Sequence, residues 1–511
     1  MLSTPQPAAI AAITNELIHA ARRMPTSIAI VLVERTRRSV DLPSMTRSAL
    51  AGAWAYTRSL AAESRRSDMA VLALGCLGVG NLWARRGASG GYSSGWPLVF
   101  IVGFGFIVAA GALCYLGVGR PPGRPHAVLC AVAIGMQTLG PTYVMSKPLL
   151  WVTGLVLAAV PLIRQARAAW LPVIVGASLI VWATVSRWSW GKAVIDVFAE
   201  VQGSTQALIH GQNPYSPLYS IYLDSPLHHI VHGAASFNYG PAVVLLSVPA
   251  RLIGDVRVTM VALNLAILVA ALIWLRRGVP GGHLGPTLVA LWVVSPFIPL
   301  MILNAWTDSV SMACAVGWLL LRDRHRNWSI ACLALALASK PTFVPIVIPM
   351  LFWVRTTWRE FLWATSAAVV IIAPFALWTG VPQFVYDTIT IYNDLPTRRD
   401  SVGFNGLSAV LGHGLLPPSL LLAGTLVTLV VFTLRRPRDY ADLLLLGSGM
   451  LIVVCFFAKQ AFLNYDYSAA IALLFVIGAG TMRPLTPLTT PLHDLRLFGD
   501  RFVRLRRSGA S

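Results

Sequence analysis

The amino-acid sequence predicts an all-α, polytopic helical membrane protein with about 14 transmembrane helices and two long loops on one side of the membrane. Three observations support this prediction. The chain of 511 residues is 56% hydrophobic, and its mean hydropathy is +0.68. Only 12% of its residues are charged, whereas a soluble protein carries about a quarter. Apolar stretches long enough to cross a bilayer recur along most of the chain.

The apolar segments form three groups, separated by long polar stretches at 189–254 and 379–417. The first group lies near 69–84, 97–117, 126–143, 148–163 and 171–188. The second lies near 255–275, 285–303, 307–322, 327–339, 341–354 and 361–378. The third lies near 418–434, 442–459 and 467–482.

Both ends of the chain are rich in arginine. We interpret residues 1–68 as a basic amphipathic arm on the cytoplasmic side, and residues 483–511 as a basic cytoplasmic tail. Much of the net charge of +20 lies in these ends and in short clusters between apolar segments. This is the positive-inside pattern, and it favours anionic lipid headgroups. We therefore expect membrane lipids, and no nucleic acid, as partners of the positive charge.

The basic clusters also predict an orientation. If both termini are cytoplasmic, almost every basic loop lies inside and both long polar stretches lie outside. Arg85 and Arg86 are the exception, and they leave open whether 69–84 crosses the membrane. The apolar segment 240–254 is short and contains two prolines. It is predicted to lie along the outer interface or to dip in and return, because a crossing would place every later basic loop outside.

Neither the cysteines nor the histidines predict a metal centre. All six cysteines lie inside apolar segments without a C-x-x-C pair, which is typical of small buried side chains. The "HHIVH" stretch spaces His228 and His232 four residues apart, but no Glu follows the first His as in the zinc-protease signature. We expect no metal and no cofactor.

Polar and aromatic side chains gather in the segments predicted to lie outside. They are Asp196, Tyr215 and Tyr239 in the first long stretch, Arg398, Arg399 and Asn405 in the second, and Lys459, Asn464 and Tyr465 near the last outer turn. Taken singly, such residues are ordinary solvated loop residues or interfacial anchors. Lys340 differs because it lies between two apolar segments with almost no loop. A cation so near hydrocarbon either snorkels to the interface or binds a partner such as a lipid phosphate.

Four short motifs follow one another on this outer side. They are Asp196 with Gly211-Gln212-Asn213-Pro214-Tyr215 after it, Tyr239-Gly240-Pro241, Lys340-Pro341, and Asn405-Gly406-Leu407-Ser408. No single motif is specific, but their order, spacing and common side over about residues 171–482 resemble the GT-C superfamily of membrane glycosyltransferases. The closer resemblance is to actinobacterial polyprenyl-phosphate-mannose-dependent mannosyltransferases, which suits a chain rich in Arg, Ala and Val.

The resemblance implies a division of the chain and an activity. Residues 171–482 would form a GT-C-like catalytic transmembrane core with two long extracytoplasmic loops, and 69–170 would be extra N-terminal transmembrane segments. The protein would move a sugar, mannose by default, from a polyprenyl-phosphate carrier to a glycolipid or polysaccharide acceptor of the cell envelope. The reaction would take place on the outer face of the plasma membrane and invert the anomeric centre.

The resemblance also implies roles for the outer residues. Asp196 would be the catalytic base that takes the acceptor's proton. The donor phosphate would be bound by cations, for which the candidates are Lys340, Arg398, Arg399 and Lys459. The sugar and the acceptor would be contacted by Tyr215, Tyr239, Asn405, Asn464 and Tyr465.

Alternatives remain open at this point. Related enzymes transfer arabinofuranose from a polyprenyl-phosphate donor, so the sugar is undecided. A flippase or other transporter of lipid-linked sugars would be expected to bury charges in the middle of its spans, whereas most acids here lie at loops. The halves of the chain also show no repeat of the kind that transporters usually carry. A noncatalytic scaffold protein would have no need of an acid ahead of the Asn-Pro-Tyr turn.

Overall fold

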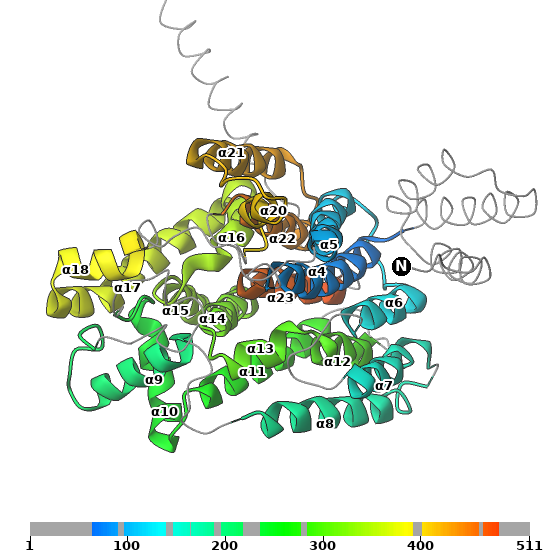
Figure 1. Ribbon diagram of the computed structural model, residues 1–511, viewed down its shortest axis with the longest axis horizontal. Coiled ribbons are helices and arrows are strands. Elements are labelled where there is room, and N and C mark those ends of the chain that lie inside the picture. Colours follow the sequence, from blue (N-terminus) through cyan, green and yellow to red (C-terminus); the bar gives the residue numbers. More distant parts are fainter. Residues whose placement is uncertain are drawn as a thin grey trace, which may run out of the picture.

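The computed structural model describes residues 64–89, 97–138, 147–163, 165–188, 196–217, 236–276, 284–391, 401–458 and 463–479. Within these ranges the chain is helical and contains no strand, which confirms the all-α prediction. Each of the expected apolar segments overlaps at least one of the described helices. Figure 1 shows the helices packed into one body.

The helices before residue 190 come from the first group of apolar segments. They are α4 (Arg66–Ser89), α5 (Pro97–Gly117), α6 (Ala127–Thr138), α7 (Lys147–Ala158), the short 3-10 turn η2 (Val160–Leu162) and α8 (Trp170–Ser186).

The middle of the chain begins with two short helices from the first polar stretch. They are α9 (Asp196–Ile209) and α10 (Pro241–Ile253). The apolar helices that follow are α11 (Arg257–Arg276), α12 (Leu284–Val294), α13 (Phe297–Leu303), α14 (Asp308–Leu321), α15 (Arg326–Leu337), the 3-10 turn η3 (Pro341–Phe343) and α16 (Val344–Trp353).

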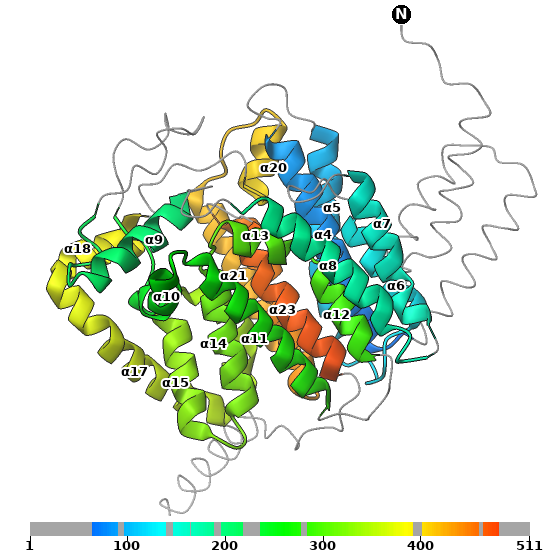
Figure 2. The same cartoon turned by 90° about the horizontal axis from the view of Figure 1, so that it is seen from below.

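The last part of the chain contains α17 (Arg355–Thr379), α18 (Val381–Val385), the π-helical turn η4 (Tyr386–Thr390), α20 (Phe404–Val410), α21 (Pro418–Leu434), α22 (Tyr440–Phe457) and α23 (Leu463–Ala479). In Figure 2, α17 and α18 lie at the opposite side of the molecule from α6 and α7.

Several of these helices are long and apolar enough to cross a membrane, which supports a membrane protein. Five qualify by length and composition alone: Arg66–Ala84, Pro97–Gly117, Arg257–Arg276, Thr356–Thr379 and Tyr440–Phe457. Two bent pairs raise the number to seven, namely α12 with α13 and α15 with η3–α16. The other apolar helices have 10–17 residues. A helix of 12 residues is about 18 Å long, which is less than the hydrocarbon thickness. The expected number of about 14 spans therefore stays a prediction.

Helix α4 is the most enclosed of the five long helices. Its apolar window is 94% buried inside the molecule, and it packs against α5, α6 and α23. A Cβ on Gly103 would lie 2.2 Å from the backbone nitrogen of Ala84, so the absence of a side chain there lets α5 approach α4 closely. The first two described helices, α4 and α5, are thus packed against the last two, α23 and α22. The division at residue 170 remains a prediction.

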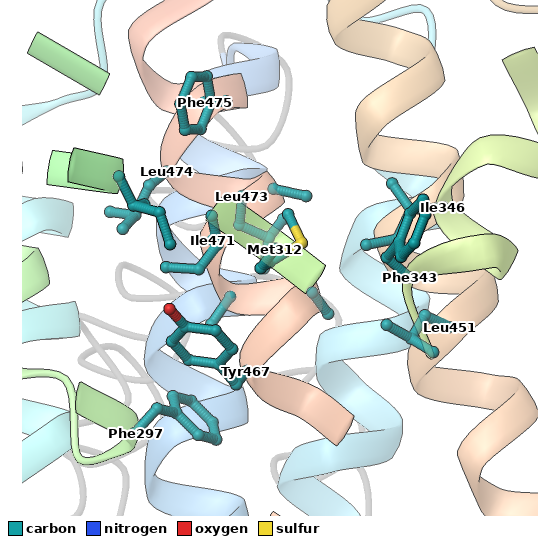
Figure 3. Packing of buried hydrophobic residues seen from close by; sticks show 14 of the residues in the cluster. Phe297, Met312, Phe343, Ile346, Leu451, Tyr467, Ile471, Leu473, Leu474 and Phe475 are labelled. Atoms are coloured by element: carbon teal, nitrogen blue, oxygen red, sulfur yellow. The ribbon is translucent and has the colours of Figure 1, made fainter. Parts of the chain in front are cut away.

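Helix α23 runs through the middle of the hydrophobic core. Figure 3 shows Tyr467, Ile471, Leu474 and Phe475 following one another along it, and all four are buried. They recur at three- and four-residue intervals and so share one stripe of the helix. Because α23 contacts α4, α11, α14 and α22, the helix is enclosed from several sides.

Candidate active site

Helix α9 presents two carboxylates on one face, because Asp196 and Glu200 are four residues apart. Asp196 is the first residue of the helix and is partly exposed, and its Oδ1 accepts a hydrogen bond of 2.8 Å from the Val197 backbone N–H. A helix N-terminus favours negative charge. Glu200 lies one turn further on and is only 1% exposed. The helix therefore carries one accessible acid and one buried acid.

Residues 304–308, which read "NAWTD", form a tight turn that directs Asp308 into the protein. Ala305 has a φ of 52°, an uncommon conformation for a residue with a Cβ, and the Trp306 N–H bonds the Met301 carbonyl at 3.0 Å. Helix α14 then begins at Asp308. Asp308 is fully buried, so its charge requires partners.

The Lys340-Pro341 motif lies at the sharper of the two bends between paired apolar helices. Helix α15 and the η3–α16 segment meet at 104°, and the residue before a proline is biased towards extended backbone. The backbone of Tyr239-Gly240-Pro241 docks here, since the Gly240 N–H bonds the Ser339 carbonyl at 2.8 Å. A Cβ on Gly240 would lie 2.0 Å from the Ala338 oxygen. Two of the sequence motifs are thus joined by main-chain contact, and this contact requires glycine.

The Lys340 ammonium forms an ion pair with Asp308. Nζ lies 2.9 Å from Asp308 Oδ2, and the two side chains are 13% and 0% exposed. Thr342 donates to Oδ1 of the same carboxylate at 3.0 Å, and Asn464 donates to Oδ2 at 2.8 Å. The sequence left Lys340 with snorkelling or a lipid phosphate as alternatives. The structure shows a protein carboxylate as its partner.

Two aromatic rings flank the Lys340 ammonium. Nζ is 5.5 Å from the centroid of the Tyr239 ring and 4.9 Å from that of Tyr465. Both distances lie in the range of cation–π attraction. Tyr239, Lys340, Asn464 and Tyr465, which were predicted from separate parts of the chain, therefore meet around Asp308.

Glu200 lies close enough to this cluster to interact with its charges. Burial raises the pKa of its carboxyl well above the usual value, and the nearby Asp196 carboxylate raises it further. The Asn238 backbone N–H and the Lys340 ammonium act in the opposite direction. Oε2 has no hydrogen-bond partner among the described residues. The carboxyl of Glu200 is therefore shifted towards its neutral form and interacts with both Asp196 and Lys340.

Tyr215 supports the cluster from behind. It is 3% exposed, and its ring packs edge-on against Phe237 and Phe384. Its hydroxyl donates to the Tyr239 carbonyl at 2.8 Å. The Asn-Pro-Tyr turn is closed by a 3.0 Å bond from the Tyr215 N–H to Asn213 Oδ1. In this position Tyr215 holds Tyr239 in place.

Asn405 is the predicted site residue of the second long stretch that the structure describes, and no described contact joins it to Lys340. Asn405 is buried in α20, which packs against α5 and α22, and its Oδ1 accepts a hydrogen bond from the Leu416 N–H at 3.1 Å. Arg398, Arg399 and Lys459 lie outside the described residues, as do the histidines of "HHIVH". In the described part of the chain, no three His, Cys, Asp or Glu side chains form a metal-type group.

Asp308 and Glu200 are the site residues that the sequence did not single out. An acid in the first turn of a helix is ordinarily explained by the helix dipole, so Asp308 had no distinguishing signal. Glu200 did have a distinguishing signal, because its spacing from Asp196 places both acids on the same face of a helix.

Residues 237–461 match the model of Glycosyltransferase family 87. The match supports a glycosyltransferase, in agreement with the predicted enzyme class. No curated protein and no solved structure matches the chain. The matched segment begins beside Tyr239 and includes Asp308 and Lys340. It includes neither Asp196 and Glu200 on α9 nor Asn464 and Tyr465 on α23.

Proposed function

We propose that this glycosyltransferase moves a sugar from a polyprenyl-phosphate carrier to an acceptor hydroxyl, with inversion at the anomeric carbon. The observation that supports the proposal best is the partly buried Lys340 ammonium, held by Asp308 between two tyrosine rings. A phosphate-linked donor needs positive charge where its leaving group develops negative charge.

The geometry leaves Lys340 able to bind a second anion. An ammonium has three N–H donors, and Asp308 takes one of them. Thr342 and Asn464 share the charge of Asp308, so the carboxylate can keep its position when a phosphate approaches the remaining donors. Asp308 thus acts as an anchor that orients the ammonium.

The proposed step needs one base and one cation. Asp196 takes the proton of the acceptor hydroxyl while its oxygen forms a bond to the anomeric carbon. The bond between that carbon and the carrier phosphate breaks, and the electron pair leaves with the phosphate. Lys340 stabilises the charge of the departing polyprenyl phosphate. The phosphate leaves as an anion, so no acid is needed to protonate it.

The sugar, the acceptor and the location are part of the proposal. Mannose is the default sugar, arabinofuranose is its competitor, and a cell-envelope glycolipid or polysaccharide is the acceptor. The reaction would take place on the outer face of the plasma membrane, with both termini in the cytoplasm. Arg398, Arg399 and Lys459 remain candidates for further phosphate contacts. The candidates for contacts with the sugar or acceptor remain Tyr215, Tyr239, Asn405, Asn464 and Tyr465.

The transfer reaction itself is the test. Membranes that contain the protein are given radiolabelled polyprenyl-phosphate mannose and, separately, the arabinofuranose equivalent, together with envelope glycolipids. Asp196→Asn is expected to lower transfer by about 10²–10⁴-fold. Asp323→Asn, which changes an exposed acid in the turn after α14, is expected to leave transfer unchanged. Full activity of Asp196→Asn would exclude Asp196 as the base, and transfer from neither donor would contradict the proposed donor class.

A further inference from the structure

Helix α4 carries a buried amide that reaches the last helix of the chain. Asn81 is fully buried in the apolar helix. Its Nδ2 donates to Asp466 Oδ2 on α23 at 2.9 Å and to the Leu77 carbonyl of its own helix at 3.0 Å. Both helices lie outside the segment that matches the family model.

Asp466 belongs to the same helical turn as two residues of the Lys340 cluster. Asn464 precedes it by two positions and bonds Asp308. Tyr465 precedes it by one and places its ring 4.9 Å from Lys340 Nζ. A shift of Asp466 therefore moves the groups that hold Asp308 and flank Lys340.

Asn464 and Tyr467 also bind this turn to neighbouring helices, through Asp308 and Asn264, but the carboxyl of Asp466 itself has few partners. Oδ1 of Asp466 has no hydrogen-bond partner among the described residues, so Asn81 supplies the side-chain hydrogen bond that the structure gives this carboxyl. Packing between α4 and its neighbours does not require an amide, since the close approach of α4 to α5 is made by Gly80 and Gly103. Because packing does not require this buried amide, we look for its role in fixing the position of the group that it bonds.

We propose that Asn81 is a positioning residue. Through Asp466 it fixes the first turn of α23 and so sets the position of the Lys340–Asp308 pair. The N-terminal helices are then a working part of the active site. The expected effect on sugar transfer rests on the proposed function. The expected effect on the position of Lys340 does not.

The first experiment compares two buried amides. Asn81→Leu removes the bond to Asp466. Gln137→Leu is the matched control, because Gln137 is as buried in α6 and also packs on α4, at Gly78. The hydrogen bond described for its amide, however, goes to Ala133 of its own helix.

Two readouts are taken on the purified full-length protein. The first is the rate at which an amine-modifying reagent labels Lys340, followed by mass spectrometry, and it does not depend on any activity. The second is the kcat and the KM for the donor. We expect Asn81→Leu to raise the labelling rate several-fold and to lower kcat/KM by about 10- to 100-fold. Gln137→Leu should change neither.

A reciprocal exchange separates positioning from a general loss of stability. Asn81→Asp with Asp466→Asn rebuilds the amide–carboxylate pair with the partners exchanged, so it should restore the Lys340 labelling rate that either single change disturbs. If Asn81→Leu does not fold, this exchange still decides the question.

Two results would overturn the inference. One is a Lys340 labelling rate in Asn81→Leu equal to that of the unmodified protein, and the other is an exchange variant that labels no better than the single variants. Failure of the unmodified protein to transfer sugar would contradict the proposed function instead, and the labelling result would still stand.

Discussion

Two buried pairs of a cation and a carboxylate face helix α9, and they differ in how completely they are enclosed. Asp255 binds Arg257 through Nε at 3.0 and 3.1 Å, and both side chains are 0% exposed. The Arg257 guanidinium stacks on Trp188 and on Phe198 of α9. Lys340 also pairs with an acid and also lies against two rings, but it remains partly accessible.

The difference separates a structural ion pair from a candidate site. The planar fork of arginine matches a carboxylate at two points, and Trp188 Nε1 gives Asp255 a further hydrogen bond of 3.1 Å. This pair ties the turn before α11 to α9. The ammonium of Lys340 contacts its acid at one point and has other donors to offer. Similar residue types thus serve stability in one place and, in our proposal, ligand binding in the other.

The largest expected effect comes from replacing each cation by methionine. Arg257→Met leaves Asp255 buried without its partner, which should cost about 3–5 kcal/mol of stability, with transfer by the folded fraction unchanged. Lys340→Met leaves Asp308 with Thr342 and Asn464, so it should destabilise less. It should nevertheless lower transfer by about 10²–10³-fold.

Thermal unfolding and donor kinetics on the same preparations measure both halves of this comparison. If Lys340→Met costs as much stability as Arg257→Met and leaves the apparent donor affinity intact, the two pairs are alike and Lys340 is not the phosphate ligand.

A smaller effect is expected from the rings that flank the two cations. Tyr465→Leu removes a cation–π contact of about 0.5–2 kcal/mol, so the donor KM should rise about 2- to 30-fold. Phe198→Leu is the matched change at Arg257 and should lower the unfolding temperature without changing KM. Tyr465→Phe keeps the ring and reports what the hydroxyl adds. An increase of the donor KM in Phe198→Leu but not in Tyr465→Leu would reverse the assignment of the two pairs.

The comparison also shows what the sequence could and could not predict. Hydrophobic runs identified the helices because burial in lipid or protein requires them, and the short polar interruption at Lys340 separated two of these runs. The position of Lys340 between apolar segments indicated that it needs a partner. The partner itself, Asp308, was not predictable, because it comes from a turn 32 residues earlier and resembles an ordinary first-turn acid.

The orientation of side chains and the number of spans could not be predicted from the sequence for a different reason. The motif predicted a contact of Tyr215 with the sugar, which stays a prediction, but sequence carries no information on which way its ring points. The structure places the ring against Phe237 and Phe384. The number of spans was also beyond reach, since helices such as α6 and α15 are apolar yet too short to cross alone. Whether they cross depends on packing, which periodicity does not encode.

The smallest expected effect concerns Glu200, the buried acid of α9 that interacts with the Lys340 ammonium. Its pKa is raised by burial and by Asp196. At pH values between the pKa of Glu200 in the unfolded chain and its higher pKa in the folded protein, the folded protein therefore binds more protons than the unfolded chain. Stability therefore falls as pH rises through this window. Glu200→Gln removes the titration, so its unfolding temperature relative to the unmodified protein should increase from about pH 5 to about pH 8. Asp323→Asn reports the effect of removing an exposed acid. A difference for Glu200→Gln that stays constant over this range would show that Glu200 is already ionised in the folded protein, and that Lys340 is compensated by two acids instead of one.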